Sequence, residues 1–460
     1  MIRTFPQAVK FLESFTPAPR EKFLGPIALK RMQYLAEIMG SSQFSYPTIH
    51  VGGTSGKGST ATIIASILAT KYKVGLNTSP HLEKISERIK INGADISDTD
   101  FIGLINELIP YIEKMKISKY GKPSTFEITI AGAFLYFKKK KVDVAVFEVG
   151  LGGAYDGTNV IRPEVAILTN VGLDHTEILG GTVEKIAKDK VGIIKPGIQV
   201  ISGVKQASVK KIVQEKCKRQ NAKLSLLGRD FNYQIKDMSE NGSTFDYFGE
   251  KNYRSLSLPL LGEHQIENAA LAIRAIEKLS NYPIIPASPV GRQSTNQPIK
   301  IANKEIRKGL KSAFIPGRME VVRKNPLVIL DGAHNTDKVQ ALVKAFGDIY
   351  PGKKTIFLVA IKSDKNAKEM LKLITPISKK IIFTEFSMMR DQGKIESYNV
   401  AILKTMVRVL KFKGDITAFK DIQEAVRQAL SLAKKDDLIL VTGSLYLVGE
   451  VRREIMNYKV

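Results

Sequence analysis

Short apolar runs rich in Val and Ile alternate with stretches of helical periodicity along the first half of the chain. The runs typical of strands are 48–51, 142–148, 165–170 and 199–202. The stretches with helical spacing are 60–69, 99–114, 127–139 and 183–193. Because strands and helices alternate, we expect an α/β fold with a mostly parallel sheet and helices on both of its faces.

The pattern changes after residue 228. Residues 229–260 lack helical periodicity and predict a β-hairpin, and 264–279 predict a helix. Residues 281–300 contain four prolines and many small polar residues, which predicts a loop, and 303–311 predict a short helix. A second alternating stretch begins at Ile315-Pro-Gly-Arg, with helices between strands predicted at 327–330, 355–359, 380–384 and 438–441. A chain of 460 residues is longer than a single hydrophobic core usually supports. We therefore predict two domains, 1–316 and 317–460, with the boundary near Pro316.

Charge and cysteine content narrow the function classes. The single cysteine, Cys217, excludes an internal disulfide. The N-terminus does not resemble a signal peptide and no apolar run could span a bilayer, so we expect a cytoplasmic protein with no membrane partner. We also expect a monomer. The net charge of +25 is compatible with nucleic-acid binding or with a surface that attracts small anions. The one dense lysine run, 138–141, ends a predicted helix and no nucleic-acid motif accompanies it, so we expect no nucleic-acid partner.

A glycine-rich loop carries the first chemical signal. Residues 50–60 read His-Val-Gly-Gly-Thr-Ser-Gly-Lys-Gly-Ser-Thr, a strand end, a glycine loop and a helix start in succession. Such a loop turns backbone N–H groups toward one point, and the helix N-terminus and Lys57 add positive charge. The spacing departs from the common G-x-x-x-x-G-K-[ST] form because Gly58 stands between Lys57 and Ser59. Glycine turns also occur for packing reasons, but the lysine and hydroxyls favour a polyphosphate ligand.

Histidines and a carboxylate follow other predicted strands. Four of the five histidines lie in polar segments beside glycine or proline, namely His81, His175, His264 and His334, whereas His50 is expected to be structural. Glu148 closes an apolar run, and the carboxyl ends of parallel strands face the ligand crevice. A carboxylate beside a phosphate loop suits Mg²⁺, although a Glu at a strand end can also cap the next loop.

At this point the sequence resembles the folylpolyglutamate synthases, often also dihydrofolate synthases, of the Mur ligase superfamily. The resemblance is nearly full length. The motifs that carry it are Gly53-Thr-Ser-Gly-Lys-Gly-Ser59, Ser79-Pro-His-Leu82, the Glu-Arg-Ile and Ile-Asn-Gly of 87–93, Glu148-Val-Gly-Leu-Gly-Gly153, Leu173-Asp-His-Thr-Glu177, His264-Gln265 with Asn268-Ala-Ala270, Pro316-Gly-Arg-Met-Glu320, Leu330-Asp-Gly-Ala-His-Asn335 and Val441-Thr-Gly-Ser-Leu-Tyr-Leu-Val-Gly449. Any one motif could mislead, but all of them in this order are specific.

The resemblance implies an N-terminal P-loop-type ATPase domain and a smaller Rossmann-like C-terminal domain. It implies an ATP-dependent ligase that joins L-glutamate to a folate, and in some members to dihydropteroate. The reaction would proceed through an acyl-phosphate intermediate. The alternatives are another ligase of this superfamily that acts on a nucleotide-linked precursor, a P-loop NTPase acting with nucleic acid, and a non-catalytic nucleotide-binding module. The segment 79–93 resembles the folate branch, which argues against the first.

The resemblance also assigns residues to roles. The catalytic set would be Lys57, Lys190 and His175. ATP would contact Thr54, Ser55, Gly56, Lys57, Gly58, Ser59, Thr60, His264, Gln265, Asn268, Arg318, Asp331 and His334. Of two Mg²⁺ ions, the first would be bound by Ser79 and Glu148 and the second by His175. Substrate would contact His81, Arg88, Phe126, Tyr155, Asp156 and Ser444. Lys190 stands where many members carry a carbamylated lysine, and an unmodified lysine that pairs with phosphate is the alternative.

Three segments depart from the family pattern. The usual Gly-Leu-x-Arg is Ala28-Leu-Lys-Arg31, the usual Gly-Gly-Arg-Leu-Asp-Ala-Thr-Asn is replaced at 152–159, and Phe-Phe-Glu is Thr125-Phe-Glu127. All three lie where the resemblance places the pteroate part of the substrate. The nucleotide half of the site is therefore better supported than the choice between dihydropteroate and the folates.

Overall fold

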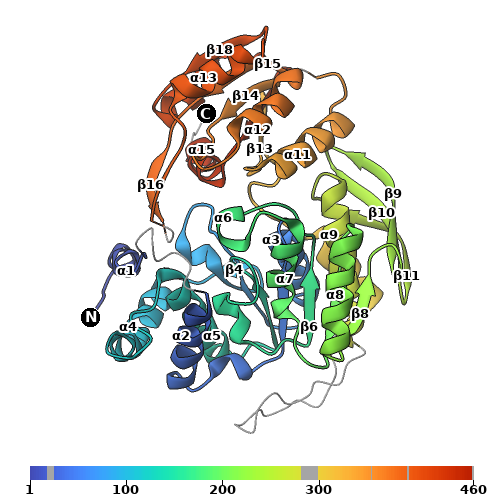
Figure 1. Ribbon diagram of the computed structural model, residues 1–460. Helices are drawn as coiled ribbons and strands as arrows, with labels where there is room; N and C mark the ends of the chain where they lie inside the picture. Colours follow the sequence, from blue (N-terminus) through green and yellow to red (C-terminus); the bar gives the residue numbers. More distant parts are fainter. Residues whose placement is uncertain (18–24, 281–298, 354, 391–392, 458–460) are drawn as a thin grey trace.

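The computed structural model describes residues 1–17, 25–280, 299–353, 355–390 and 393–457, and it contains two large sheets (Figure 1). The first sheet has eight strands in the order β4-β3-β2-β5-β1-β6-β7-β8. Its members are β1 (Thr48–Gly52), β2 (Val74–Asn77), β3 (Ile89–Ile91), β4 (Ala94–Asp95), β5 (Val144–Glu148), β6 (Val165–Leu168), β7 (Gln199–Ser202) and β8 (Lys223–Leu226). All neighbouring strands are parallel except at the β2–β3 and β3–β4 pairs.

Helices cover both faces of this sheet, so its central strands are buried on both sides. One face packs against α3 (Lys57–Leu68), α9 (Glu263–Ser280) and α10 (Asn303–Lys311), where Val51 and Ile167 lie in the core. The other face packs against two groups of helices. These are α1 (Phe5–Glu13), α2 (Pro26–Ile38), α4 (Asp98–Lys116) and α5 (Thr125–Lys139), and then α7 (Val183–Lys190) and α8 (Ala207–Arg219). Burial on both faces explains the continuous apolar runs of the sequence.

Residues 229–260 form a three-stranded antiparallel sheet in place of the predicted hairpin. Its strands are β9 (Asn232–Ser239), β10 (Gly242–Phe248) and β11 (Asn252–Leu258), in the order β11-β10-β9. Phe245, Tyr247 and Leu256 share the apolar core that contains α9. A hairpin of two strands would leave out β11, which follows the turn at 249–251, pairs with β10 and packs against α10.

The second large sheet has the order β12-β13-β19-β14-β15-β18 and is parallel except for β12. Its strands are β12 (Glu320–Lys324), β13 (Leu327–Leu330), β14 (Thr355–Val359), β15 (Ser378–Phe383), β18 (Asp415–Ala418) and β19 (Leu438–Thr442). On one face lie α11 (Thr336–Ile349), α12 (Ala367–Ile374) and α13 (Val400–Val409), and on the other α14 (Ile422–Leu432) and α15 (Leu445–Asn457). A small hairpin pairs β16 (Ser387–Arg390) with β17 (Gly393–Glu396).

The predicted α/β class and most predicted elements are confirmed, with shifts at the ends. The helix expected at 60–69 already begins at Lys57, and the helix expected at 183–193 ends at Lys190 and continues as a 3-10 turn, Val191–Ile193. Most of the proline-rich segment 281–300 lies outside the described residues. No described helix is both long and apolar enough to cross a bilayer. Below, the residues up to the end of α10 are called the N-terminal part, and those from Gly317 onward are called the C-terminal part.

Candidate functional site

The glycine loop between β1 and α3 is held in one conformation by the segment after β6. The backbone N–H of Thr54 donates to the carbonyl of Asn170 at 3.0 Å, and that of Ser55 donates to Asn170 Oδ1 at 2.8 Å. Gly56 has φ +79°, and a Cβ there would lie 2.4 Å from Asn268 Oδ1. Glycine is therefore required at this position both for its backbone angle and for the close approach of α9.

Two cavities meet at this loop. The first, of about 360 Å³, is lined on the N-terminal side by Thr54, Asn170, His264, Gln265 and Asn268, among others. The second, of about 190 Å³, is lined by Lys57, Ser79, Glu148, His175, Lys190, His334 and Ser444, among others. Thr54, Ser55, Gly56, Ser59, Arg318 and Lys338 line both. The structure thus brings most of the predicted nucleotide and metal residues to one place, although Thr60 is buried beneath the loop and outside both walls.

Glu148 ends β5 against the first turn of α3. Its Oε2 accepts a hydrogen bond from the backbone N–H of Ser79 at 2.9 Å. A Cβ at Gly58 would lie 3.3 Å from both carboxylate oxygens, which explains the extra glycine in the loop. Burial raises the pKa of Glu148, while Lys57, the Ser79 N–H and Arg318 oppose that rise. The carboxylate is thus available at the phosphate loop, and a neighbouring cation would keep it charged.

Lys190 lies in the last turn of α7 with 5% of its surface exposed. Its Nζ donates to the carbonyl oxygen of Gly53 at 2.9 Å. Burial lowers the pKa of Lys190 to about 7, and the charge of Lys57 adds to this effect. Near neutral pH, the Lys190 amine is therefore uncharged and nucleophilic in a large fraction of molecules, unlike the amine of an ordinary exposed lysine.

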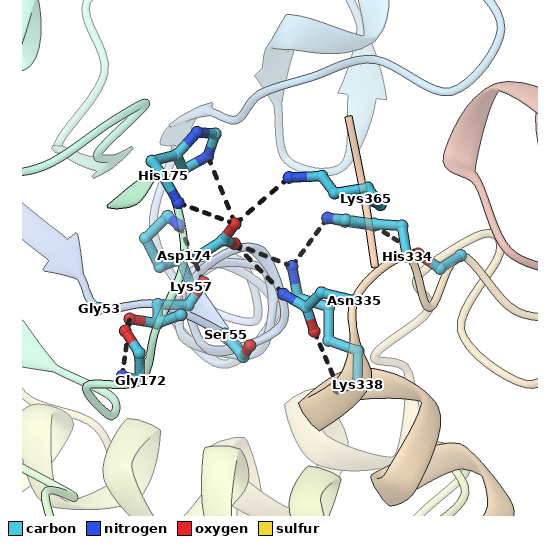
Figure 2. A network of polar contacts seen from close by, with 12 residues as sticks. Gly53, Ser55, Lys57, Gly172, Asp174, His175, His334, Asn335, Lys338 and Lys365 are labelled. Atoms are coloured by element: carbon cyan, nitrogen blue, oxygen red, sulfur yellow. Dashed lines mark hydrogen bonds and ion pairs between the residues drawn. The ribbon is translucent and has the colours of Figure 1, made fainter. Parts of the chain in front are cut away.

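A network centred on Asp174 joins the two parts of the chain (Figure 2). Asp174 Oδ1 lies 3.4 Å from Lys365 Nζ, and its Oδ2 lies 3.9 Å from Lys338 Nζ and accepts from Asn335 Nδ2 at 3.3 Å. The backbone N–H of His175 donates to Oδ1 at 3.1 Å. Burial alone would raise the pKa of Asp174, but the charges of His175, Lys338 and Lys365 outweigh it and hold the pKa below its usual value.

As a predicted Mg²⁺ ligand, His175 has less support from the structure than Glu148. Its ring nitrogens lie 4.0 Å from Asp174 Oδ1 and 3.8 Å from Glu177 Oε1. Burial lowers the pKa of His175, and the carboxylate of Asp174 opposes that fall. Within the described ranges, no three His, Cys, Asp or Glu side chains come together as a metal site. Glu148 and His175 alone would therefore need phosphate oxygens or water to complete a Mg²⁺ shell.

The C-terminal part contributes Arg318, Asp331 and His334. Asp331 accepts hydrogen bonds from the backbone N–H groups of Met319 at 2.9 Å and Ala333 at 2.8 Å, so it fixes the segments on either side of it. Arg318 is thereby held at the boundary between the two cavities. His334 Nδ1 donates to the carbonyl oxygen of Gly332 at 2.8 Å, and His334 Nε2 lies 2.9 Å from Lys338 Nζ.

Neutral polar groups from α9 also line the first cavity. Asn268 Nδ2 donates to Gln265 Oε1 at 3.1 Å, and the Thr60 hydroxyl donates to Asn268 Oδ1 at 3.3 Å. Burial lowers the pKa of His264 to about 4, so its ring is uncharged at neutral pH. A pocket with an amide and a neutral imidazole suits a heterocycle better than a phosphate.

The predicted substrate residues are dispersed. Ser444 lines the second cavity, whereas His81, Arg88, Phe126, Tyr155 and Asp156 lie outside the walls of both cavities. Arg88 is 1% exposed and its Nε donates to His81 Nδ1 at 3.0 Å. Asp156 is buried and accepts from the backbone N–H groups of Leu151 and Thr158, each at 2.9 Å. In this conformation Arg88 and Asp156 hold the loops that surround the second cavity.

Sequence reasoning missed several residues that line the cavities or organise them, among them Asn170, Asp174, Lys338 and Lys365. Asn170 and Asp174 follow β6, and their position after a strand could have pointed to them. Lys338 and Lys365 carry no motif signal, because 70 lysines and arginines are spread along the chain.

Comparisons with known proteins agree with this geometry. Residues 51–276 match the model of the Mur ligase middle domain, and residues 317–445 match that of the Mur ligase glutamate ligase domain. The chain is 33% identical over 439 residues to the dihydrofolate synthase/folylpolyglutamate synthase of Bacillus subtilis, covering 95% of this chain and 96% of that protein. The folylpolyglutamate synthase of Thermotoga maritima matches with a TM-score of 0.81, 30% identity and coverage of 99% and 97%. The Mycobacterium tuberculosis folylpolyglutamate synthase complexed with ADP matches with a TM-score of 0.84, 27% identity and coverage of 98% for both chains.

Proposed function

Because this chain belongs to the folylpolyglutamate synthase and dihydrofolate synthase family of Mur ligases, we propose that it adds L-glutamate to folates and to dihydropteroate. Members of this family are ATP-dependent glutamate ligases, and the ADP complex of a close structural relative supports ATP as the co-substrate. One observation carries the proposal for this chain. The first cavity continues past the glycine loop into a second cavity where cations from both parts of the chain converge.

The charge of the second cavity suits this reaction. Besides Lys190, five of its lining side chains are Lys or Arg, against the two carboxylates of Glu148 and Asp174. ATP, glutamate and the acceptor carboxylate are all anions, and their reacting groups must approach one another. Preorganised positive charge therefore supplies most of the required stabilisation, and no Ser-His-Asp arrangement is needed.

The chemistry proceeds in two steps. The acceptor carboxylate attacks the γ-phosphorus of ATP, which gives an acyl phosphate and ADP. The neutral amine of glutamate then attacks the acyl carbon, the C–O bond to phosphate breaks, and an amide, inorganic phosphate and a proton result. In our proposal, the loop N–H groups and Lys57 hold the transferred phosphate, and Arg318 approaches it from the C-terminal part. His264, Gln265 and Asn268 border the adenine.

We further propose that Mg²⁺ is held by Glu148, with His175 beside a second ion. The buried carboxylate at the phosphate loop fits a cation that uses one or two carboxylates together with substrate phosphates. When bound, Mg²⁺ neutralises charge on the phosphates. The Ser79 backbone N–H already donates to Glu148, so the loop at Ser79 supports the carboxylate, and a ligand role for its hydroxyl remains a prediction.

The remaining assignments are proposals of the same kind. Lys190 is proposed to be carbamylated, with support from its buried, neutral amine. His334 is proposed to close the nucleotide site from the C-terminal part together with Arg318 and Asp331, and Ser444 to face the incoming substrate. His81, Arg88, Phe126, Tyr155 and Asp156 are proposed to shape the acceptor region. The domain boundary near Pro316, a monomeric state and a cytoplasmic location also stay predictions.

A mass-resolved ligase assay tests the function. The protein is incubated with ATP, Mg²⁺ and L-glutamate, together with a reduced folate, dihydropteroate, or a nucleotide-linked peptidoglycan precursor. We expect the folate to gain one glutamate for each ADP released, through a γ-linkage where the acceptor already ends in glutamate. Dihydropteroate should also gain one glutamate. Addition to the nucleotide-linked precursor alone would refute the folate assignment and leave the ligase mechanism in place.

A further inference from the structure

Lys338 lies at the point where the two cavities meet. It belongs to the first turn of α11, where Asn335 is the N-cap and its Oδ1 accepts from the Lys338 backbone N–H at 3.0 Å. Among the residues that line both cavities, the cationic ones are Arg318 and Lys338. A chain of phosphates that runs from one cavity to the other must therefore pass both side chains.

The ammonium group of Lys338 has weak partners in this structure. Asp174 is its ion-pair partner in the described part of the chain, at 3.9 Å, and the same carboxylate is shared with Lys365, Asn335 and the His175 N–H. Burial lowers the pKa of Lys338 to about 7, with Lys57 and Arg318 adding to the effect and Asp174 opposing it. The site therefore lacks the negative charge that would fully stabilise this cation.

His334 supports the same interpretation through its ring nitrogens. Its Nδ1 lies 2.8 Å from the carbonyl oxygen of Gly332, so Nδ1 carries the proton and donates. Its Nε2, 2.9 Å from Lys338 Nζ, is then a lone pair that accepts from the ammonium group. Burial and the charge of Lys338 hold the pKa of His334 well below its usual value, which agrees with a neutral ring. His334 thus orients Lys338 without neutralising it.

We propose that Lys338 is a phosphate-binding residue of the active site, and that Asp174 holds its ammonium group until the nucleotide arrives. The phosphates replace a distant, shared carboxylate with close anionic oxygens. Because Asp174 belongs to the N-terminal part and Lys338 to the C-terminal part, this exchange takes place where the two parts meet. The identification of the anion as nucleotide phosphate rests on the proposed function, and the carboxylate of glutamate is the competing anion.

Calorimetric titration of the full-length protein tests the proposal. ADP and adenosine are titrated separately into the wild type, Lys338→Ala and Lys338→Gln, and KM is measured for ATP and for glutamate. We expect both variants to bind ADP at least about tenfold more weakly, the scale of a lost hydrogen bond to a charged group, with adenosine binding within twofold. Lys338→Gln retains a donor toward His334, so it preserves the fold if the alanine variant does not.

Lys344→Ala is the matched control. Lys344 lies on the same helix and pairs with Glu263 across the same junction, but its side chain is 61% exposed and lines neither cavity. We expect its ADP affinity to match that of the wild type. Asp174→Asn should bind ADP severalfold more tightly in metal-free buffer, because it frees Lys338 and keeps an acceptor for Asn335.

Three results would overturn the inference. These are unchanged ADP binding in both Lys338 variants, an equal loss of ADP and adenosine binding, and a rise in KM confined to glutamate. Each of them is distinct from failure of the proposed function, because ADP binding is measured without any acceptor. Even if the protein did not modify folates, the ADP affinities of the Lys338 variants would still show whether Lys338 binds phosphate.

Discussion

Replacing Lys190 tests whether a buried amine is converted to an anion in this enzyme. With a pKa of about 7, about nine tenths of Lys190 is neutral at pH 8, against about 0.4% for a lysine with the ordinary pKa near 10.4. The reactive amine is thus enriched about two-hundredfold. The neutral amine adds to CO₂, a proton leaves, and the product is a carbamate whose negative charge suits a cation beside the phosphates.

The sign of the pH dependence follows from the lowered pKa. As the pH falls from 8 to 6, the neutral fraction of Lys190 falls from about 0.9 to about 0.1, so carbamylation and the activity that depends on it should fall roughly tenfold. The assay is the initial rate in CO₂-free buffer, with and without added bicarbonate, together with carbon NMR under labelled CO₂. We expect one labelled lysine and a rate that recovers with bicarbonate.

Three variants separate the carbamate from an unmodified lysine. Lys190→Ala should regain part of its activity with small carboxylates, which replace the missing anion. Lys190→Arg keeps the positive charge but cannot be carbamylated, so it should be inactive and not be rescued. Lys188→Ala, an exposed lysine on the same helix, should behave like the wild type. Full wild-type activity without CO₂, no labelled carbamate, and substantial activity in Lys190→Arg would refute the reasoning.

The other predictions concern the phosphate loop, the metal and the acceptor. Lys57→Ala should lower turnover at least about a hundredfold while the melting temperature stays close to the wild type, and normal turnover would remove Lys57 from the mechanism. Glu148→Gln and His175→Ala should each raise the Mg²⁺ concentration needed for half-maximal rate, and unchanged titrations for both would place the metal elsewhere. In wild-type turnover, coupled detection of ADP and product mass should give one ADP per glutamate added, and a persistent excess of ADP would indicate uncoupled hydrolysis.

The parts of the site that could be predicted from the sequence are those where function constrains a short stretch of chain. The glycine loop is one example, because Gly53 and Gly56 have φ of +138° and +79° and both approach other segments closely. Glu148 is another, since the end of a buried parallel strand places its last side chain at the crevice. In both cases the local sequence contains the physical reason for the position.

Motif matching located other residues but could not establish what they touch. Arg88 and Asp156 fit family motifs, yet Arg88 donates to His81 and Asp156 binds backbone N–H groups of its own loop. A buried charged group needs partners, and here neighbouring protein groups supply them. The three-stranded sheet β9–β11 was likewise missed in detail, because its third strand, β11, is held by pairing with β10 and by packing against α10, which lies more than 40 residues later in the chain.

The lysines of the C-terminal part show why the other site residues could not be predicted from the sequence. Lys338 and Lys365 are ordinary members of a lysine-rich sequence until the fold brings them within 4 Å of Asp174, more than 160 residues earlier in the chain. A lysine whose partners come from a distant part of the chain has no distinguishing pattern in the residues next to it.

The same separation has a mechanistic consequence. The N-terminal part carries the glycine loop and Glu148, while Arg318 and Lys338, which line both cavities, come from the C-terminal part. If Arg318 and Lys338 bind phosphate as proposed, complete phosphate binding requires the two parts to be together, and contact between the parts would couple nucleotide binding to assembly of the reaction cavity.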